Sequence, residues 1–404
     1  MKKILLLPSL FLPIPCVKGG AVEQLITYLL EINESYENVK FIVISKFDSE
    51  AADTKYRNTS VYYFDEQNTS VHHLPLFCIR YCLYKLFCKL FCNRISKHIF
   101  KINHEPLNMY QYFCRYIAKK EKVDSICIEG QWEVPFLHLR DIVGKENLFT
   151  HLHAVRDEQI SLRRELPNSI SISQYVHDNW VKDKSIVGRN PILLNAANID
   201  AFNIIITQED RNVSRKLLGV EQNELLLLFC GRIIPVKGIR ELLDAFDLLV
   251  DMPIKLLLIG SDSFGNSSNT EFENEIMQRI SSDKRIIPLG FVRNDKLPHY
   301  YSLADIQIIP TTCQEGAGMV AIEGMAAGLP LITTVSGGLV EYVNDEVAIQ
   351  LPIDKNLYLN IANAIKHLHQ NPNKRHNMGQ AGKDRAKMFS KENYYKNFIE
   401  IFDN

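Results

Sequence analysis

The sequence predicts an α/β fold with two domains, each built on a mostly parallel sheet covered by helices. With 404 residues, 46% of them apolar, the chain is too long for one hydrophobic core and apolar enough for two. Short β-branched or leucine-rich runs alternate with amphipathic helical patterns, an arrangement that yields parallel sheets. Residues 195–203 have little apolar periodicity and separate two such series. We therefore predict domains at 1–200 and 201–389, followed by a helix at about 390–404.

The first series predicts strands at 3–7, 39–45, 61–64, 124–129, 148–151, 169–173 and 192–194. The second predicts strands at 224–230, 254–259, 285–288, 305–309, 330–333 and 347–350. Open α/β sheets bind ligands beyond the carboxyl ends of their strands, so candidate site residues are sought there. The last helix has Ser390 as a candidate N-cap and carries an aromatic stripe.

Composition excludes several classes of protein. Lys plus Arg total 46 and Asp plus Glu total 47, a net charge of −1, which gives no reason to expect a nucleic-acid partner. The nine cysteines form no Cys-x-x-Cys pair, so a reducing cytosol is favoured over a disulfide framework or a zinc site. These features predict a cytoplasmic protein.

The first residues resemble a signal peptide, because Met1-Lys2-Lys3 precedes an apolar run. Three prolines interrupt that run, however, and the pair Gly19-Gly20 follows closely. A buried first strand is the better interpretation. No stretch approaches the roughly 18 uncharged apolar residues of a membrane-spanning helix.

The first strand leads into a loop that ends with Gly19-Gly20, and a helix starts there. Paired glycines let the backbone approach a ligand, and the start of a helix favours phosphate. A tight strand-to-helix connection is an equally good explanation of this pair.

The first strand of the second series leads into a loop with two cations, Arg232 and Lys237, flanked by Gly231 and Gly238. Two cations at the carboxyl end of a strand suit a diphosphate. Surface cations surrounded by water are the alternative, but the flanking glycines favour the phosphate interpretation.

Two glutamates eight positions apart, Glu315 and Glu323, follow the strand that ends at Ile309. With a helix beginning near Gly318, Glu315 lies in the loop and Glu323 lies more than one turn into the helix. The amides of residues 316–319 would then be unpaired and could hold phosphate, while the carboxylates could accept hydrogen bonds from sugar hydroxyls.

Taken together, these segments resemble the retaining glycosyltransferases of family 4, which have the GT-B fold: two Rossmann-like domains facing each other across a cleft. The matching segments are Gly231-Arg232, Lys237-Gly238, the Glu315 and Glu323 pair, Ala327-Gly328-Leu329-Pro330, Gly337-Gly338, Gly19-Gly20, Phe149-Thr150-His151-Leu152-His153, Ser173 and Asn195. The sequence departs from the family at Ala196, where glycine is usual, and at Gly324, where alanine is common. Residues 74–122 match no pattern.

The resemblance implies that 1–200 binds the acceptor, that 201–389 binds a nucleotide-diphosphate sugar, and that the helix at 390–404 packs back on the first domain. The implied catalytic residues are His153, Glu315, Arg232 and Lys237. Arg232 and Lys237 would neutralise the diphosphate, Glu315 would bind hydroxyls of the transferred sugar and Glu323 the ribose. His153 would lie near the anomeric centre, and His151 would be a packed or solvated side chain. The implied donor-binding residues are Gly19, Gly20, Gly231, Arg232, Lys237, Phe291, Val292, Glu315, Gly316, Ala317, Gly318, Met319, Val320 and Glu323.

The implied reaction is the transfer of a hexose, with retention, to a glycan or a lipid-linked acceptor in surface-polysaccharide synthesis. No Asp or Glu adjoins His153 in the sequence pattern expected for an inverting base. No Asp-x-Asp triplet stands at a strand end, so we expect neither a metal nor another cofactor. The alternatives are a sugar-nucleotide epimerase, a phosphorylase and a non-catalytic subunit that binds nucleotide sugars.

Residues 71–122 form a basic segment interleaved with aromatic and apolar residues. Its cations, against only Glu105 and Glu121, are Arg80, Lys85, Lys89, Arg94, Lys97, Lys101, Arg115, Lys119, Lys120 and Lys122. Such a segment can lie in the interface of an anionic membrane, here the inner face of the cell membrane. An ordinary amphipathic helix packed on the first domain is the alternative, and the charge excess favours the membrane.

Overall fold

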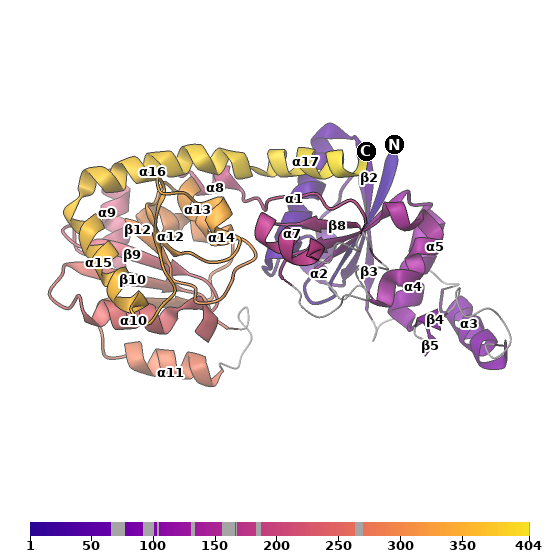
Figure 1. The fold of residues 1–404 in the computed structure, drawn as a ribbon, viewed down its shortest axis with the longest axis horizontal. Coiled ribbons are helices and arrows are strands. Elements are labelled where there is room, and N and C mark those ends of the chain that lie inside the picture. The colour runs from indigo at the N-terminus through magenta and orange to yellow at the C-terminus, as the bar shows by residue number, and fades with distance from the viewer. Residues whose placement is uncertain are drawn as a thin grey trace. The chain divides into compact units, whose positions relative to one another are not determined.

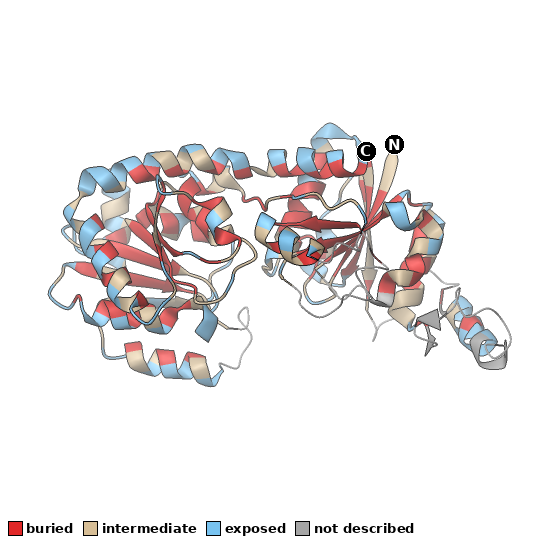
Figure 2. Ribbon diagram, viewed as in Figure 1, coloured by how far each residue is buried: buried red, intermediate tan, exposed pale blue. Residues whose placement is uncertain are grey.

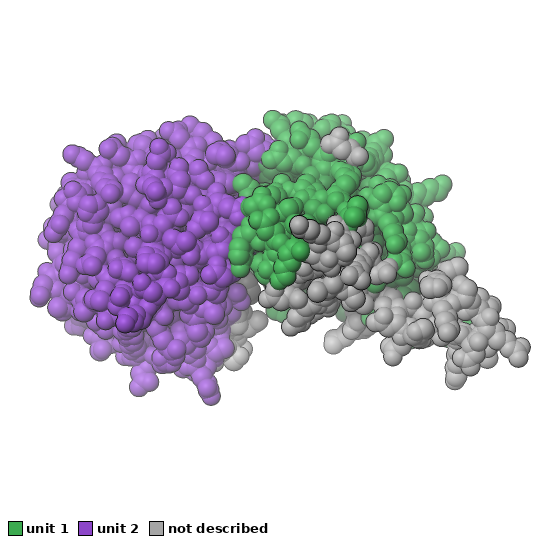
Figure 3. Space-filling view, in the orientation of Figure 1, with its two compact units in different colours: residues 1–194, 394–404 green, residues 195–393 purple. Residues whose placement is uncertain are grey.

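The computed structural model describes residues 1–65, 77–91, 101–102, 105–130, 134–155, 166, 168–182, 187–262 and 270–403. The chain divides into two compact units (Figures 1 and 3). Unit 1 comprises Met1–Leu194 and Tyr394–Asn404, and unit 2 comprises Asn195–Asn393. The division falls slightly before the predicted boundary at 200/201. Among the described residues, no helix has both the length and the apolar character needed to span a bilayer.

Unit 1 is built on a six-stranded parallel sheet with the order β3-β2-β1-β6-β7-β8. Its strands are β1 (Lys2–Pro8), β2 (Val39–Lys46), β3 (Thr59–Phe64), β6 (Ser125–Glu129), β7 (Leu148–Leu152) and β8 (Asn168–Ser171). A short antiparallel pair is formed by β4 (Lys101–Ile102) and β5 (Glu105–Pro106). The helices are α1 (Ala21–Tyr36), α2 (Ser49–Asp53), α3 (Phe77–Phe91), α4 (Met109–Glu121), η2 (Val134–Leu139), α5 (Arg140–Val143), η3 (Lys145–Asn147) and α7 (Gln174–Val181). The first strand lies at the centre of the sheet, and Ile4 to Leu7 are fully buried, as expected.

Unit 2 repeats this architecture with the order β11-β10-β9-β12-β13-β14, again all parallel. Its strands are β9 (Leu225–Cys230), β10 (Ile254–Ile259), β11 (Ile286–Gly290), β12 (Ile306–Ile309), β13 (Leu331–Thr334) and β14 (Ala348–Leu351). Its helices are α8 (Ile199–Phe202), α9 (Gln208–Leu217), η4 (Pro235–Lys237), α10 (Ile239–Asp247), α11 (Glu271–Ile280), α12 (Leu297–Leu303), α13 (Met319–Ala326), α14 (Leu339–Tyr342), α15 (Leu357–Gln370), α16 (Pro372–Ala386) and η5 (Lys387–Phe389). Figure 2 shows the strands of both sheets buried beneath their helices. The predicted α/β class with two parallel sheets is confirmed.

One predicted strand is absent, and another ends earlier than predicted. Residues 192–194 form no strand, because Ile192 makes only a single bridge to Ser171 before the chain passes into unit 2. Ser173 does not extend β8 but begins α7, since its hydroxyl oxygen accepts a hydrogen bond from the amide of Val176 at 3.2 Å. A serine side chain at that position stabilises the start of a helix rather than a sheet.

The last helix, α17 (Lys391–Asp403), packs its aromatic stripe on unit 1. Tyr395 donates a hydrogen bond to the side-chain oxygen of Asn33 at 2.7 Å. The ring of Phe398 lies 6.2 Å from that of Phe41, and the ring of Phe402 lies 5.0 Å from that of Phe149. Each buried aromatic side chain contributes about 1.5 to 3 kcal/mol, so this helix is an integral part of the core of unit 1.

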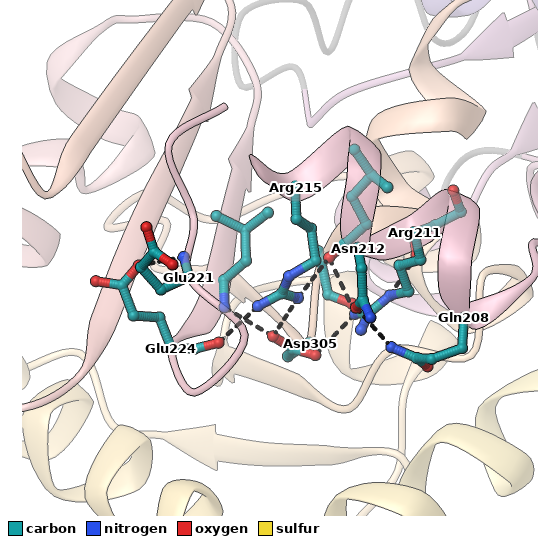
Figure 4. A network of polar contacts seen from close by, with 11 residues as sticks. Gln208, Arg211, Asn212, Arg215, Glu221, Glu224 and Asp305 are labelled. Carbon is teal, nitrogen blue, oxygen red and sulfur yellow. Dashed lines mark hydrogen bonds and ion pairs between the residues drawn. The ribbon is translucent and has the colours of Figure 1, made fainter. Parts of the chain in front are cut away.

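A partly buried ionic network lies at the amino-terminal ends of strands in the sheet of unit 2 (Figure 4). The carboxylate of Asp305 accepts hydrogen bonds from Arg211 at 2.8 Å and from Arg215 at 2.9 Å, both on α9. It also accepts the amide of Leu226, at the start of β9, at 2.7 Å. One carboxylate thus joins α9 to β9 and to the residue that precedes β12.

We predict that Asp305→Ala lowers the free energy of unfolding by about 3 to 5 kcal/mol, because it leaves the buried guanidinium of Arg215 without its carboxylate. Glu275→Ala is the matched control, since it breaks the exposed pair with Arg240 and should cost about 1 kcal/mol or less. Urea unfolding followed by circular dichroism measures both. Equal losses in the two variants would contradict the structural role of the network.

Candidate active site

The loop after β9 carries the two predicted phosphate-binding cations and is pressed against the end of β12. Gly238 has a φ of +71°, and a Cβ atom there would lie 1.8 Å from the carbonyl oxygen of Pro310. Only glycine fits this position. The carbonyl oxygen of Val236 accepts hydrogen bonds from the amide of Thr312 at 2.9 Å and from the hydroxyl of Thr311 at 3.0 Å. The two loops are therefore fixed to each other.

This contact brings together two predicted site residues that lie 78 positions apart. The ammonium group of Lys237 donates a hydrogen bond to Oε1 of Glu315, and the hydroxyl of Thr311 donates to the same oxygen at 2.9 Å. The amide of Glu315 in turn donates to Ser336 at 3.0 Å. Lys237 and Glu315 were expected to bind different parts of a donor, and here they bind each other. Arg232 is exposed on the loop that carries Lys237.

The glycine-rich loop after β12 supplies a row of free backbone donors. Helix α13 begins at Met319, next to the predicted start, and its N-cap Gly318 offers no side-chain cap. Within the described part of the chain, none of the amides of Gly316, Ala317, Gly318, Met319 and Val320 donates to a protein acceptor. Unpaired amides at the positive end of a helix dipole form a binding site for an anionic group.

Glu323 lies in the second turn of α13, where its carboxylate accepts a hydrogen bond from the hydroxyl of Tyr301 at 2.8 Å. Burial raises the pKa of this carboxyl group to about 7, and the bond from Tyr301 only partly offsets the effect of burial. The neighbouring Gly324 explains the departure from the family pattern. A Cβ atom there would lie 1.7 Å from the side-chain oxygen of Gln307, so Gln307 requires this glycine.

Phe291 and Val292 follow β11 on the same carboxyl edge of the sheet, two strands away from β9. Phe291 is 38% exposed, which leaves its ring available to a planar ligand. The preceding Gly290 has a φ of +65° and turns the chain at the strand end.

In unit 1, the buried carboxylate of Glu129 joins the two histidines at the end of β7. It accepts hydrogen bonds from Nδ1 of His151 at 2.8 Å and from Nε2 of His153 at 3.1 Å. Burial acts to raise the pKa of Glu129, but the charges and hydrogen bonds of the two histidines outweigh it and hold the pKa well below its ordinary range. His151 is fully buried, whereas 13% of the side chain of His153 is exposed.

The sequence analysis missed Glu129 and expected no carboxylate beside His153, and that expectation is wrong. A usable signal was present, because Glu129 ends β6 and pairs in register with His151 on β7. Glu129 and His151 therefore meet wherever these strands are neighbours.

Gly130 lies beside both His153 and the first turn of α1 within unit 1. A Cβ atom on Gly130 would lie 3.3 Å from the ring of His153 and 3.4 Å from Val22, in the first turn of α1. The buried Glu23 lies at the same place, and a Cβ atom on Gly20 would come 2.2 Å from its carboxylate. Burial raises the pKa of Glu23 to about 7. The side chain of Glu23 fills the space beside Gly20, so the geometry favours the tight-connection interpretation of Gly19 and Gly20.

One group of potential metal ligands occurs among the described residues: the donor atoms of Cys127, Glu129 and His151 lie within 4.8 Å of one another. The sequence analysis did not single it out. Burial and the nearby Glu129 raise the pKa of the Cys127 thiol well above its ordinary value, so the thiolate that would bind zinc is disfavoured. The thiol instead donates to Glu129 at 3.2 Å. These residues therefore do not fit a resident metal ion.

We predict that Glu323→Gln stabilises the protein more at about pH 8 than at about pH 5. Between its ordinary pKa of 4.5 and its raised pKa of about 7, Glu323 keeps a proton in the native state that the unfolded chain releases. Native stability therefore falls as the pH rises through this window, and glutamine removes that loss. Urea unfolding at both pH values measures the difference, with the exposed Glu271→Gln as control. A pH-independent effect would contradict the raised pKa.

The described geometry can be compared with known proteins. Residues 210–385 match the family described as glycosyl transferases group 1. The lipopolysaccharide 1,2-N-acetylglucosaminetransferase of Salmonella typhimurium is 33% identical over 140 residues, which are 33% of this chain and 36% of the relative. The chain spans roughly a third to a half of the length of the curated relatives that it matches.

Solved structures that are similar over the whole chain include the following two. A glycosyltransferase from Rickettsia africae has a TM-score of 0.75 at 18% identity, with 100% of this chain and 98% of that chain covered. Anabaena HepE in complex with UDP-glucose has a TM-score of 0.72 at 18% identity, with 100% and 99% covered. At such identities the similarity concerns the fold, and it confirms the expected GT-B class. Residues 210–385 of this GT-B chain thus match the family of glycosyl transferases group 1.

Proposed function

We propose that this chain is a retaining glycosyltransferase that moves a hexose from a UDP-sugar to a glycan or lipid-linked acceptor. The observation that carries the proposal is the convergence of Arg232, Lys237, Glu315 and the free amides of residues 316–320 at one edge of unit 2. This combination of cations, amides and a carboxylate suits a diphosphate joined to a sugar. The UDP moiety is favoured by the fold similarity to Anabaena HepE, which was solved with UDP-glucose.

The ion pair between Lys237 and Glu315 prepares this site for its donor. A diphosphate would replace Glu315 as the partner of Lys237, and the released carboxylate could then accept hydrogen bonds from sugar hydroxyls. Cleavage of the glycosyl–phosphate bond builds negative charge on the leaving phosphate. Arg232, Lys237 and the amides at the start of α13 stabilise that charge without the need to reorganise. Glu323 and Phe291 are proposed to bind the ribose and the base.

The acceptor is assigned to unit 1, where Glu129 holds His153 in a fixed orientation beside Gly130 and Val22. A role in surface-polysaccharide synthesis is supported by the lipopolysaccharide enzyme of Salmonella among the relatives. Contact of residues 71–122 with the inner face of an anionic membrane would bring a lipid-linked acceptor close. Of that segment, residues 71–76, 92–100 and 103–104 lie outside the described residues.

One observation favours a second candidate, transfer with inversion. A histidine that donates to a buried carboxylate is the usual form of a general base, and His153 with Glu129 forms such a pair. We favour retention, because the Glu315 and Glu323 pattern resembles that of retaining enzymes. An attack by the acceptor from the leaving-group side would let a phosphate oxygen take its proton.

An epimerase, a phosphorylase and a non-catalytic binding subunit would each behave differently from a transferase. An epimerase forms its product without an acceptor, and a phosphorylase needs phosphate or a bound pyridoxal cofactor. A non-catalytic binding subunit is disfavoured, because Arg232, Lys237, Glu315 and His153 are all present where a degenerate binder would be expected to have lost some of them.

We predict that Lys237→Ala and Glu315→Ala each lower the turnover of a UDP-sugar at least about a hundredfold, because each removes a preorganised charge partner. Slow donor hydrolysis, measured over a panel of nucleotide sugars, gives a readout without a known acceptor. Lys296→Ala removes an exposed lysine of unit 2 and is the matched control.

These assays are run in EDTA, because the proposed site uses no metal ion. Near-normal turnover in Lys237→Ala or Glu315→Ala rules out the assigned donor site. Activity that returns only when magnesium or manganese is added contradicts metal independence.

We predict that the product keeps the anomeric configuration of the donor, which proton NMR of the new linkage measures. With retention, Glu129→Gln should alter the rate without removing the acidic limb of the pH profile, the fall in rate at low pH that a general base produces, because His153 is then not the base. An inverted product, together with a lost pH limb in Glu129→Gln, would replace retention by the second candidate.

A further inference from the structure

A cavity of about 740 Å³ is lined by residues of α3 and α4 in unit 1, a size typical of small-molecule sites. Figure 1 labels both helices. It belongs to the outer surface of α4 and not to the strand ends that carry His153. No step of the proposed reaction uses it. Its lining combines aromatic rings with three cations, a mixture that neither the sugar site nor an ordinary core requires.

The aromatic wall of the cavity is held in place by its own contacts. Tyr84 of α3 and Tyr112 of α4 have ring centroids 4.8 Å apart. The hydroxyl of Tyr84 accepts a hydrogen bond from the amide of Leu107 at 2.8 Å. Tyr84 and Leu107 are both buried, while Phe87 and Leu83 of α3 complete the apolar lining from the exposed side. The wall is therefore a preformed apolar surface.

Arg115 supplies a buried positive charge to this cavity. Its side chain is on α4, the residue is only 8% exposed, and Nη1 donates to the carbonyl oxygen of His138 at 2.6 Å. Among the described residues, no carboxylate oxygen lies within ion-pair distance of this guanidinium, although Asp141 offsets part of its charge from farther away. A buried cation is stabilised by a nearby anion, so an anionic group bound in the cavity would stabilise Arg115.

Lys119, one turn further along α4, adds a second charge to the same lining. Residues four positions apart on a helix lie on the same face, so Lys119 and Arg115 are neighbours. Partial burial and the charge of Arg115 lower the pKa of Lys119, and Asp141 partly opposes them. Arg80 of α3 lies over the ring of Tyr116, with its guanidinium carbon 5.6 Å from the ring centroid. An anion placed between Arg115 and Lys119 would relieve the repulsion.

The outer face of α3 extends the apolar surface into solvent. Ile79, Leu83 and Leu86 recur at helical spacing and are each more than half exposed. Helix α3 contains Arg80, Lys85 and Lys89 and no acidic residue. An apolar helix face edged by cations is suited to the interface of an anionic bilayer.

We propose that the cavity between α3 and α4 binds a phosphate-bearing lipid, with its chain against Tyr84, Phe87 and Tyr112 and its phosphate on Arg115 and Lys119. The proposal refines the proposed contact of residues 71–122 with a membrane and does not rest on the donor chemistry of unit 2. A second copy of this chain is a poor occupant, because its own α3 and α4 would bring like charges together.

The test uses dodecyl phosphate below its micelle concentration, titrated into the full chain by calorimetry. We expect dodecyl phosphate to bind and inorganic phosphate to bind at least about tenfold more weakly, because only the former fills the apolar wall. Lys119→Gln should weaken dodecyl phosphate at least about tenfold through the loss of one charge-assisted hydrogen bond. Leu83→Gln should weaken it by removing apolar lining.

The matched control is Lys120→Gln, because Lys120 is the next residue on α4 but lies over the ring of Tyr62 and not in the cavity. It should bind dodecyl phosphate as the unmodified chain does. Lys119 and Leu83 are exposed, so their substitution should leave the fold intact, which circular dichroism checks. Equal binding by Lys119→Gln and Lys120→Gln would overturn the proposal, as would equal binding of dodecyl phosphate and inorganic phosphate.

Flotation with phosphatidylcholine vesicles, with and without phosphatidylglycerol, extends the test to a membrane. We expect the chain to float with the anionic vesicles and Lys119→Gln to float less. If Lys119→Gln and Leu83→Gln float as well as the unmodified chain, the cavity is not the lipid site. Hydrolysis of the UDP-sugar should be unchanged in both variants, so a failure of the lipid proposal remains distinguishable from a failure of the glycosyltransferase proposal.

Discussion

The close approach of Gly238 to the carbonyl oxygen of Pro310 is the constraint on which the site in unit 2 depends. It locks the loop after β9 to the loop after β12, and the hydrogen bonds from Thr311 and Thr312 to Val236 secure that contact. Lys237 and Glu315 meet only because these loops are fixed. Any side chain at position 238 would separate the loops and with them the cation from the carboxylate. The contact between Lys237 and Glu315 therefore requires glycine at position 238.

The carboxyl groups at the strand ends differ in charge because their neighbours differ. Glu129 is buried but has two histidine donors, which keep it ionised. Glu323 is buried with only a tyrosine hydroxyl, and Glu23 has no charged donor in the described part of the chain, so burial raises both pKa values to about 7. The two units therefore present one permanent and two titratable negative charges. Binding of a sugar hydroxyl to Glu323 would couple to the release of a proton near neutral pH.

The sequence predicted the sheets well, because buried parallel strands are continuous apolar runs such as 254–259, which the structure reproduces as β10. The sequence did not predict contacts between side chains that lie far apart along the chain. For α4, the alternative of an amphipathic helix packed on the first domain agrees with the structure, because Phe113 and Ile117 are buried in the core of unit 1. The tyrosine cluster between α3 and α4 and the capping box of Asn108 were not predicted, because apolar periodicity does not reveal them. The contact of Glu129 with His153 follows from the pairing of β6 with β7, and the ion pair of Lys237 with Glu315 follows from a packing contact 78 positions apart. The sequence suggested which residue types suit a donor. It did not predict which protein groups these residues contact.

Helix α17 completes the core of unit 1, whose other residues are 1–194. Phe41 and Phe149 are buried against Phe398 and Phe402. During synthesis, residues 394–404 emerge after all of unit 2, so the rings of Phe41 and Phe149 lack their partners until residues 195–393 have been translated. Unit 2, by contrast, is continuous in sequence. Translation of unit 1 begins before that of unit 2. All residues of the core of unit 2 are nevertheless synthesised before the core of unit 1 is complete.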